Sequence, residues 1–232
     1  MHCNICGGTE FVTLKKRGPV RCASCMSLER TRLLWLHIER LQVQPGWRVL
    51  HLAPERGVYQ RLTQMLAPGN YTVADFDPTG YPFAPDCVQI DLTCMEDWPS
   101  DHYDLIIHSH VIEHIPATLA YPIFHLHRML KPTGTHLCVI PFLPGDYDEC
   151  FGLIGKNERL RRFGQSDHVR RLGTEDLHAH LGSIVTLPAV PDAREFFSED
   201  TLRDANIPES DWSGFHIGTV LALRKQDYKL SL

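Results

Sequence analysis

The residues with the clearest chemical potential are four cysteines near the N-terminus. They form two Cys-x-x-Cys pairs separated by fifteen residues, namely Cys3, Cys6, Cys22 and Cys25. Two tight turns at this spacing can present four sulfurs to one ion, and Gly7 and Gly8 permit the first turn. Because four thiolates fill every position around a tetrahedral Zn²⁺, the spacing predicts a structural zinc site rather than a catalytic one. The alternative is four reduced surface thiols.

A second group of polar residues follows successive predicted strands. Glu55 comes just after the first strand, Asp75 ends the second and Asp91 ends the third. Because the carboxyl ends of parallel strands meet at one edge of a sheet, we expect these carboxylates to lie together. Asp75 could accept the two hydroxyls of a ribose, and Asp91 could accept from the exocyclic amine of adenine. The pattern therefore predicts an adenosine-containing ligand.

The elements that position these residues alternate along the chain. Short apolar runs and amphipathic stretches follow one another, which predicts parallel strands joined by helices on both faces of a sheet. Ser27 is expected to cap a helix that continues to Leu41. The apolar run over residues 215–223 is expected to form a last, antiparallel strand. The predicted strands before it are residues 48–53, 71–74, 87–90, 103–108 and 135–140.

Over about residues 46–225 the chain resembles the class I S-adenosylmethionine-dependent methyltransferases of the type 11-like kind. The sharpest segments are Tyr103 to Ile107, His110 to Ile115 and Leu130 to Gly134. A narrower group within that superfamily looks more similar still, because it also has four N-terminal cysteines. The further segments shared with that group are Ser27 to Arg30, Leu50 to Glu55 and Phe163 to Arg170.

The resemblance implies an α/β, Rossmann-like fold: a doubly wound, mostly parallel seven-stranded sheet that binds S-adenosylmethionine. It divides the chain into a zinc-ribbon module (1–30), a linking helix (31–45) and a methyltransferase domain (46–232). Residues 145–182 of that domain are expected to cover the acceptor. The cofactor-binding residues that it implies are Ala53, Glu55, Gly57, Asp75, Asp91, Leu92 and His108.

The chain departs from the superfamily in its cofactor loop. The usual acidic-x-Gly-x-Gly-x-Gly loop falls on residues 51–57, where Gly57 is the one glycine that remains. Those glycines allow close approach of the backbone to the cofactor, so Glu55 is a substantial change. A carboxylate at this position could accept from the α-ammonium group of the cofactor. Alternatively, the loop has lost the ability to bind it.

The segment His110-Val111-Ile112-Glu113-His114 allows several interpretations. It matches the H-x-x-E-H spelling of inverted zinc proteases, but Pro116 leaves little helix to hold such a site. It also resembles the E-x-x-E-H metal site of small-RNA 2′-O-methyltransferases. Glu113 and His114 could instead shape the start of the helix beside the cofactor, and His110 or His114 could act as a catalytic base.

Residues 156–173 form the third polar constellation. Six cations face two acids there, and the segment lies where related enzymes cover the acceptor. Arginine can bind a phosphate or carboxylate through two parallel hydrogen bonds, and His168 is the preferred catalytic base because imidazole titrates near neutrality. A solvated amphipathic helix is the alternative. The predicted substrate-binding residues are Arg162, Gln165, Asp167 and Arg170.

Composition limits the class of protein. The chain of 232 residues is 43% apolar with a net charge of −5, which favours a folded core over a disordered chain. It has no apolar run of about 18 residues and no secretory layout at the N-terminus, so we expect a soluble, cytoplasmic protein without a membrane partner. Residues 1–48 carry a local charge of +5, which leaves −10 on the remainder.

These observations predict a methyltransferase that modifies an oxygen or nitrogen of a small polar metabolite. The Arg, His and Gln cluster suggests an acceptor with a sugar or an anionic group. One alternative is an RNA methyltransferase that grips its substrate with the basic ribbon, although Phe11 is the one aromatic in residues 1–30. The other is a non-catalytic binding protein with a degenerate cofactor loop. The sequence does not indicate an oligomeric state.

Overall fold

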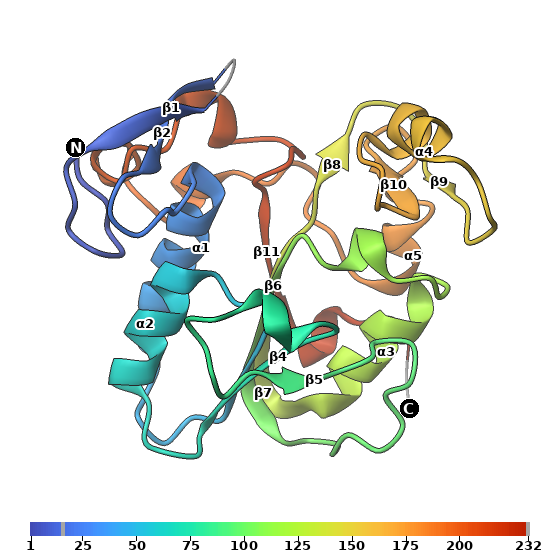
Figure 1. Ribbon diagram of the computed structural model, residues 1–232, viewed down its shortest axis with the longest axis horizontal. Helices are drawn as coiled ribbons and strands as arrows, with labels where there is room; N and C mark the ends of the chain where they lie inside the picture. Colours follow the sequence, from blue (N-terminus) through green and yellow to red (C-terminus); the bar gives the residue numbers. More distant parts are fainter. Residues whose placement is uncertain (15–16, 231–232) are drawn as a thin grey trace.

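A six-stranded sheet forms the centre of the computed structural model, which describes residues 1–14 and 17–230 (Figure 1). The order across the sheet is β11-β7-β6-β3-β4-β5, and neighbouring strands are parallel except for β11, which is antiparallel to β7. The strands are β3 (Val49–Leu52), β4 (Tyr71–Asp75), β5 (Val88–Gln89), β6 (Tyr103–Ser109), β7 (Leu130–Val139) and β11 (Val220–Arg224).

The α/β, doubly wound fold class predicted from the sequence is confirmed. All four residues of β3 are buried, as is typical of a parallel strand with helices on both sides. The predicted strands fall on β3 to β7, and the C-terminal apolar run contains the antiparallel β11.

The sheet has six strands in the described residues, one fewer than expected. The chain that could form the seventh makes an isolated antiparallel bridge between Val185 and Tyr228, and Tyr228 lies four residues beyond the end of β11. Two backbone hydrogen bonds flank this bridge, from Thr186 N to Asp227 O and from Lys229 N to Ile184 O. The residues opposite the next positions, Lys225–Asp227, form a 3₁₀ helix, and Pro188 and Pro191 lack the N–H that a strand must donate, so the pairing does not extend.

Helices cover both faces of the sheet (Figure 1). None of the helices within residues 1–14 and 17–230 combines the length and apolarity that a bilayer crossing requires. The α-helices are α1 (Glu29–Arg40), α2 (Arg56–Met65), α3 (Ala120–Met129), α4 (Lys156–Phe163), α5 (Leu181–Ile184) and α6 (Glu199–Asp204). The 3₁₀ helices are η1 (Pro78–Gly80), η2 (Ile112–His114), η3 (Ala193–Glu195), η4 (Glu209–Asp211) and η5 (Lys225–Asp227).

Alternate residues of the strands point to opposite faces of the sheet and belong to two separate hydrophobic cores. Leu105 and Ile107 of β6 point toward α1 and α2, where Trp35 and Leu62 belong to the same buried cluster. Ile106, between them, points to the opposite face and joins the cluster that contains α3. This alternation is the period-2 pattern of a strand, and it explains why β6 reads as one continuous apolar run.

The N-terminal cysteines flank a hairpin of β1 (Phe11–Leu14) and β2 (Arg17–Cys22). Cys3, Ile5 and Cys25 are buried in the same cluster as the residues of α1 and α2 that face the sheet. The cysteine module therefore packs into the core of the main domain; its separation at residue 30 stays a prediction. Ser27 does not cap α1, because Leu28 is the N-cap residue and Ser27 Oγ lies 3.2 Å from Cys25 Sγ.

A small cap follows the fifth parallel strand. Its sheet has the order β8-β10-β9, with β8 (Phe142–Leu143), β9 (Asp148–Glu149) and β10 (Arg170–Gly173). Helix α4 connects β9 to β10, and the whole unit stands at the carboxyl edge of the main sheet (Figure 1). The predicted acceptor-covering segment, residues 145–182, contains all of this cap except β8.

Candidate functional site

A cavity of about 520 Å³ opens at the carboxyl edge of the central sheet. This volume is within the range of about 300–1,000 Å³ that is typical of small-molecule sites. Leu52 of β3, Ala74 of β4 and the residues that follow β6 all contribute to its wall. Of the residues predicted for the site, the cavity brings together Ala53, Asp75, Asp91, Leu92, His110 and His114.

Asp75 is held in a fixed orientation at the end of β4. Its Oδ1 accepts from the backbone N–H of Asp77 at 2.8 Å, and its Oδ2 accepts from the Tyr81 hydroxyl at 2.8 Å. A carboxylate has about four lone-pair directions, so each oxygen can accept a further bond from a ligand. The Asp75 carboxylate is therefore an oriented acceptor at the cavity wall.

Asp91 is oriented in a similar way on the next loop. Its Oδ1 accepts from both the backbone N–H and the hydroxyl of Thr93, at 2.8 and 2.7 Å. Phe76 also lines the cavity, and it remains 67% exposed, which is unusual for a phenylalanine. Two oriented carboxylates and an exposed aromatic ring thus surround one end of the cavity.

The loop after β3 reaches the cavity at Ala53 but not at Glu55. Ala53 has a positive φ of 49°, the left-handed conformation for which glycine is usually chosen. Glu55 Oε2 instead accepts from His51 Nε2 at 2.9 Å. Burial opposes ionisation of Glu55, but this hydrogen bond and the charges of His51 and Arg30 lower its pKa overall. The predicted contact of Glu55 with an ammonium group remains a prediction.

Gly57 faces the cysteine module and not the cavity. A β-carbon at Gly57 would lie 3.0 Å from Ile5 Cγ2 and 3.4 Å from Cys25 Sγ. The single glycine that remains of the cofactor loop is therefore explained by packing between α2 and the module. Gly57 is not among the residues that line the cavity, and its contact with the cofactor stays a prediction.

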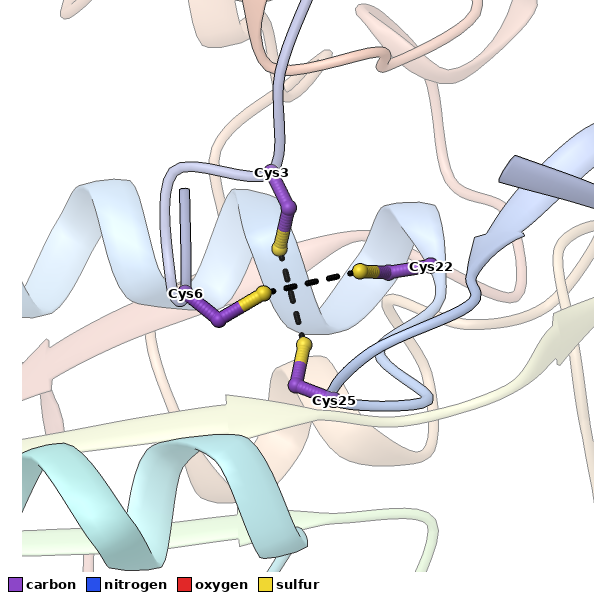
Figure 2. Close-up of side chains that lie close together, drawn as sticks. All are labelled: Cys3, Cys6, Cys22 and Cys25. Atoms are coloured by element: carbon purple, nitrogen blue, oxygen red, sulfur yellow. Dashed lines mark hydrogen bonds between the residues drawn. The ribbon is translucent and has the colours of Figure 1, made fainter. Parts of the chain in front are cut away.

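The four N-terminal cysteines converge on one point (Figure 2). Cys3 Sγ lies 3.5 Å from Cys25 Sγ, and Cys6 Sγ lies 3.5 Å from Cys22 Sγ. A disulfide needs about 2.05 Å between its sulfurs, whereas a tetrahedral Zn²⁺ with bonds of about 2.3 Å separates them by about 3.8 Å. The arrangement fits a zinc ion and not disulfides.

Arg32 adds a second observation consistent with thiolates. Its side chain is completely buried, and its Nε, Nη1 and Nη2 donate to the carbonyls of Ala205, Ser27 and Asn206. Burial lowers the pKa of this guanidinium, while the nearby cysteines oppose the shift. A fixed cation beside four sulfurs favours their ionised form, which is the form that binds zinc.

The predicted histidines lie at two different places. His110 and His114 line the cavity, and His168 stands behind them with its ring 4.6 Å from that of His114. His108 is fully buried within the sheet, where its ring lies 4.9 Å from the ring of His136. His108 faces the packed core because β6 is buried on both sides, and the structure does not place it at the cavity.

Glu113 occupies the centre of the histidine group. Its side chain is 1% exposed, with Oε1 3.6 Å from His110 Nδ1 and 4.0 Å from His168 Nε2. Burial raises the pKa of Glu113 to about 8. Burial and the charge of Arg30 lower the pKa of His110 to about 4, and burial also lowers the pKa of His168.

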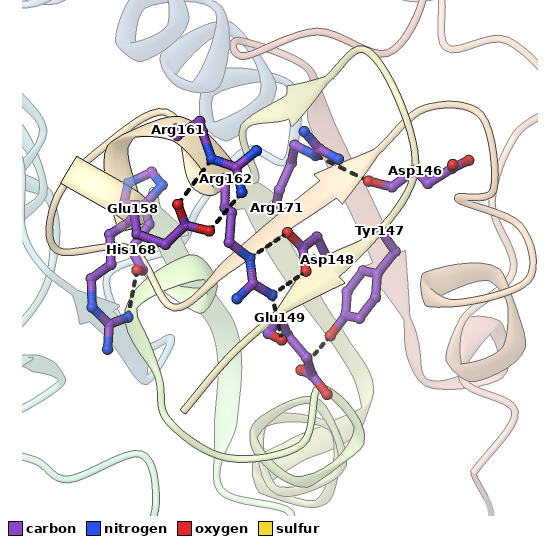
Figure 3. A network of polar contacts seen from close by, with 10 residues as sticks. Asp146, Tyr147, Asp148, Glu149, Glu158, Arg161, Arg162, His168 and Arg171 are labelled. Carbon is purple, nitrogen blue, oxygen red and sulfur yellow. Dashed lines mark hydrogen bonds and ion pairs between the residues drawn. The ribbon is translucent and has the colours of Figure 1, made fainter. Parts of the chain in front are cut away.

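The cap arginines are engaged within the protein (Figure 3). Arg162 donates from Nε to Asp148 Oδ2 at 2.8 Å and forms a second bond to Oδ1 of the same carboxylate. Arg170 is fully buried and donates to the carbonyls of Ile112, Ile115 and Ala117. Burial removes Arg170 from contact with a substrate, which corrects that prediction, whereas substrate binding by Arg162 stays a prediction.

The other two predicted substrate residues are exposed. Gln165 is exposed in the turn after α4, and Asp167 Oδ2 lies 3.7 Å from His114 Nδ1. Asp167 is thereby in contact with a residue of the cavity wall, as is Arg170 through the carbonyl of Ile115. Phe76, Tyr81 and Thr93 also line the cavity and were not predicted, although Phe76 and Thr93 lie within two residues of the predicted carboxylates.

Several solved structures are similar to this chain. The YcgJ protein from Bacillus subtilis superposes with a TM-score of 0.50 at 16% identity, over 78% of this chain and 80% of that one. A methyltransferase from Mesorhizobium loti that depends on S-adenosylmethionine gives 0.47 at 16% identity, over 82% and 96%. The trans-methyltransferase CalH, solved with S-adenosylhomocysteine, gives 0.35 at 19% identity over 47% of this chain, which spans 35% of CalH.

No protein-family profile matches this chain, and no curated protein matches its sequence. At the identities above, the likeness is one of fold. The strand order and the carboxyl-edge cavity agree with it, so the chain has the class I S-adenosylmethionine-dependent methyltransferase fold, with an N-terminal hairpin that carries the four-cysteine cluster.

Proposed function

We propose that this protein transfers the methyl group of S-adenosylmethionine to an oxygen or nitrogen of a small polar metabolite. The observation that carries the proposal is the carboxyl-edge cavity. Oriented carboxylates, Asp75 and Asp91, lie at one part of its wall, and two imidazoles, His110 and His114, lie at another. The fold supports this assignment, since open α/β sheets bind ligands at this edge.

The residues around Asp75 and Asp91 suit an adenosine group. Asp75 would accept the ribose hydroxyls, Asp91 would accept the adenine amine, and the exposed ring of Phe76 would cover the purine. When bound, S-adenosylmethionine supplies a methyl group attached to a positively charged sulfur. The protein then has to align the acceptor and remove water, which accounts for most of the rate in such displacements.

The acceptor side of the cavity favours a neutral polar nucleophile. His114 is 37% exposed at its side chain, so it can take a proton from an oxygen or nitrogen that enters the cavity. Arg162 and Arg170, which would have favoured a phosphate or carboxylate, are bound to Asp148 and to backbone carbonyls. We therefore propose an uncharged hydroxyl or amine acceptor in place of an anionic one.

Calorimetry with S-adenosylhomocysteine tests the cofactor site. Asp91→Ala and Asp75→Asn should weaken binding by about 10- to 100-fold, the equivalent of about 1.5–3 kcal/mol for a hydrogen bond to a charged group. Asp97→Ala is the matched control, since Asp97 is exposed and does not line the cavity. Absence of heat with the wild-type protein would end the proposal.

Transfer of a labelled methyl group tests the acceptor. Wild-type protein and His114→Ala would be incubated with labelled S-adenosylmethionine and a metabolite extract or total RNA. We expect label in small molecules from the metabolite extract, and at least a tenfold lower rate with His114→Ala. Label confined to RNA would contradict the small acceptor and support the RNA methyltransferase that the sequence left open.

A further inference from the structure

Glu113 is a buried carboxyl group without a hydrogen-bond partner. Its side chain is 1% exposed, and neither Oε1 nor Oε2 finds a donor among the described residues. Leaving such a group unpaired costs free energy, and buried polar atoms in native proteins are almost always satisfied. His168 Nε2, which lies 4.0 Å from Glu113 Oε1, is likewise buried and without a partner among the described residues.

The atoms around Glu113 are those that bind metals. One oxygen of Glu113 and one nitrogen each of His114 and His168 lie within 4.8 Å of one another. His110 Nδ1 lies 3.6 Å from Glu113 Oε1. Neighbouring ligands of a tetrahedral ion with bonds of about 2.1 Å are separated by about 3.4 Å, so small side-chain rotations would complete the coordination.

His110 is already oriented as a metal ligand would be. Its Nε2 lies 2.8 Å from the backbone carbonyl oxygen of Ile217 and must donate to it. In the neutral imidazole, the lone pair is then on Nδ1, the nitrogen that faces Glu113. Histidine ligands commonly donate their second N–H to a carbonyl in this way, which fixes the tautomer and the ring orientation.

The backbone around the group is rigidly held. His110 has a positive φ of 56°, which turns the chain sharply at the end of β6. The carbonyl of Glu113 accepts from Val169 N at 2.9 Å, which brings His168 beside η2. Arg170 then ties β10 to three carbonyls of the segment that follows His110. Four side chains from two distant parts of the sequence are thus preorganised.

We propose that Glu113, His114 and His168, with His110, bind one divalent transition-metal ion beside the carboxyl-edge cavity. Imidazole and carboxylate together suit ions such as Mn²⁺, Fe²⁺, Co²⁺ and Zn²⁺. Four protein ligands would fill a tetrahedral ion, whereas an ion that accepts five or six ligands would keep a further position. Because His110 and His114 line the cavity, that position would face it and could hold an oxygen of the acceptor. This last role rests on the proposed methyltransferase function and would narrow the acceptor to an oxygen nucleophile. The ion would then take the place of His114 as the group that promotes loss of the acceptor's proton, because a metal-bound imidazole has no free lone pair.

Metal titration of the zinc-loaded full-length protein tests the site without any measurement of activity. Mn²⁺ binding would be followed by the electron paramagnetic resonance signal of the free ion, and a second equivalent of Zn²⁺ by calorimetry. We expect one site per chain beyond the cysteine zinc. Glu113→Gln and His168→Gln should each weaken it at least about 100-fold, because loss of a direct ligand should cost more than the roughly 10- to 100-fold typical of residues that support a ligand. His180→Gln is the matched control, because His180 pairs with Asp176 at 3.1 Å on the surface.

Binding of neither ion, or equal binding by wild type and both site variants, would overturn the proposal. S-adenosylhomocysteine calorimetry on the same samples shows that the variants are folded. It also separates the two proposals. Normal S-adenosylhomocysteine binding without binding of Mn²⁺ or a second Zn²⁺ would contradict the metal site alone. Metal binding without S-adenosylhomocysteine binding would contradict the proposed function and support the metal site.

Discussion

Gly57 packs directly against Cys25. A β-carbon at Gly57 would lie 3.4 Å from both Cβ and Sγ of Cys25. Gly57 belongs to the first turn of α2, and the loop before that helix turns at Ala53 on the wall of the cavity. The four-cysteine cluster and the candidate cofactor loop are therefore separated by a single helical turn and supported by the same contact.

This contact predicts the effect of Gly57→Ala. The added methyl group would be compressed against Ile5 Cγ2 at 3.0 Å, and overpacking of this kind costs about 1–3 kcal/mol. We expect a lower melting temperature and faster release of zinc to a chromogenic chelator. Adding Ile5→Leu, which removes the methyl branch at the β-carbon, should restore part of the loss. Gly46→Ala is the control, since a β-carbon there meets nothing within 4 Å.

Removal of the cysteine metal should destabilise the main domain as well as the hairpin. Cys3 and Cys25 share a buried cluster with α1 and α2, and a structural zinc site contributes its binding free energy to folding. Elemental analysis should find one zinc per chain in wild type and none in Cys22→Ser, with a clearly lower melting temperature. Cys94→Ser, at an exposed cysteine outside the cluster, should behave like wild type. A zinc-free wild-type protein with unchanged melting would refute the site.

Arg170 should matter for stability more than for substrate. Its guanidinium satisfies three buried carbonyls, and Arg170→Lys can reach at most part of that set with one ammonium group. We expect a loss of about 2–5 kcal/mol in urea unfolding. Arg161→Ala should change little, since Arg161 is 72% exposed at its side chain. Wild-type stability combined with slow turnover would instead support a role for Arg170 in binding the acceptor.

His37 should make the protein sensitive to mild acid. Its side chain packs edge-on against Phe196 and Phe197, and burial, together with Arg40, lowers its pKa to about 4. Between the unfolded value of about 6.5 and about 4, the unfolded chain binds a proton that the folded chain does not. Stability is therefore fully present above about pH 6.5 and falls as the pH is lowered to about 4.

The matching variant is His37→Leu, which removes the titrating group. The free energy of unfolding should decrease more steeply with acid in wild type than in the variant, by up to about 3 kcal/mol between pH 7 and pH 4. Because both proteins carry the same cysteine site, acid release of zinc affects them equally and cancels in the difference. Parallel pH profiles would show that His37 contributes nothing to acid sensitivity.

Much of the fold could be predicted because strand and helix periods depend on local sequence. Buried parallel strands read as short apolar runs, and Asp75 and Asp91 stand at their ends, so the cavity wall could be located in advance. The cysteine spacing was equally local. Each of these signals lies within a few residues of the feature that it predicts.

The roles of the arginines could not be predicted in the same way. A guanidinium binds a carboxylate, a phosphate or a backbone carbonyl with the same donors, and only tertiary contacts decide which one it meets. Arg170 meets carbonyls that lie more than fifty positions earlier in the chain. Gly57 is a similar case, since its neighbours Ile5 and Cys25 belong to another part of the sequence.

The prolines that stand in place of a seventh strand also protect the molecule from aggregation. Pro188 and Pro191 line the same cavity as Val220 to Leu223 of β11 and the residues before it, so they lie close to this edge strand. An edge strand with free backbone groups is a template for pairing with another chain, and a neighbouring segment that lacks N–H donors blocks that approach. The opposite edge, β5, has two residues and offers little to pair with. Neither edge strand of the central sheet is therefore well suited to pair with a strand of another chain.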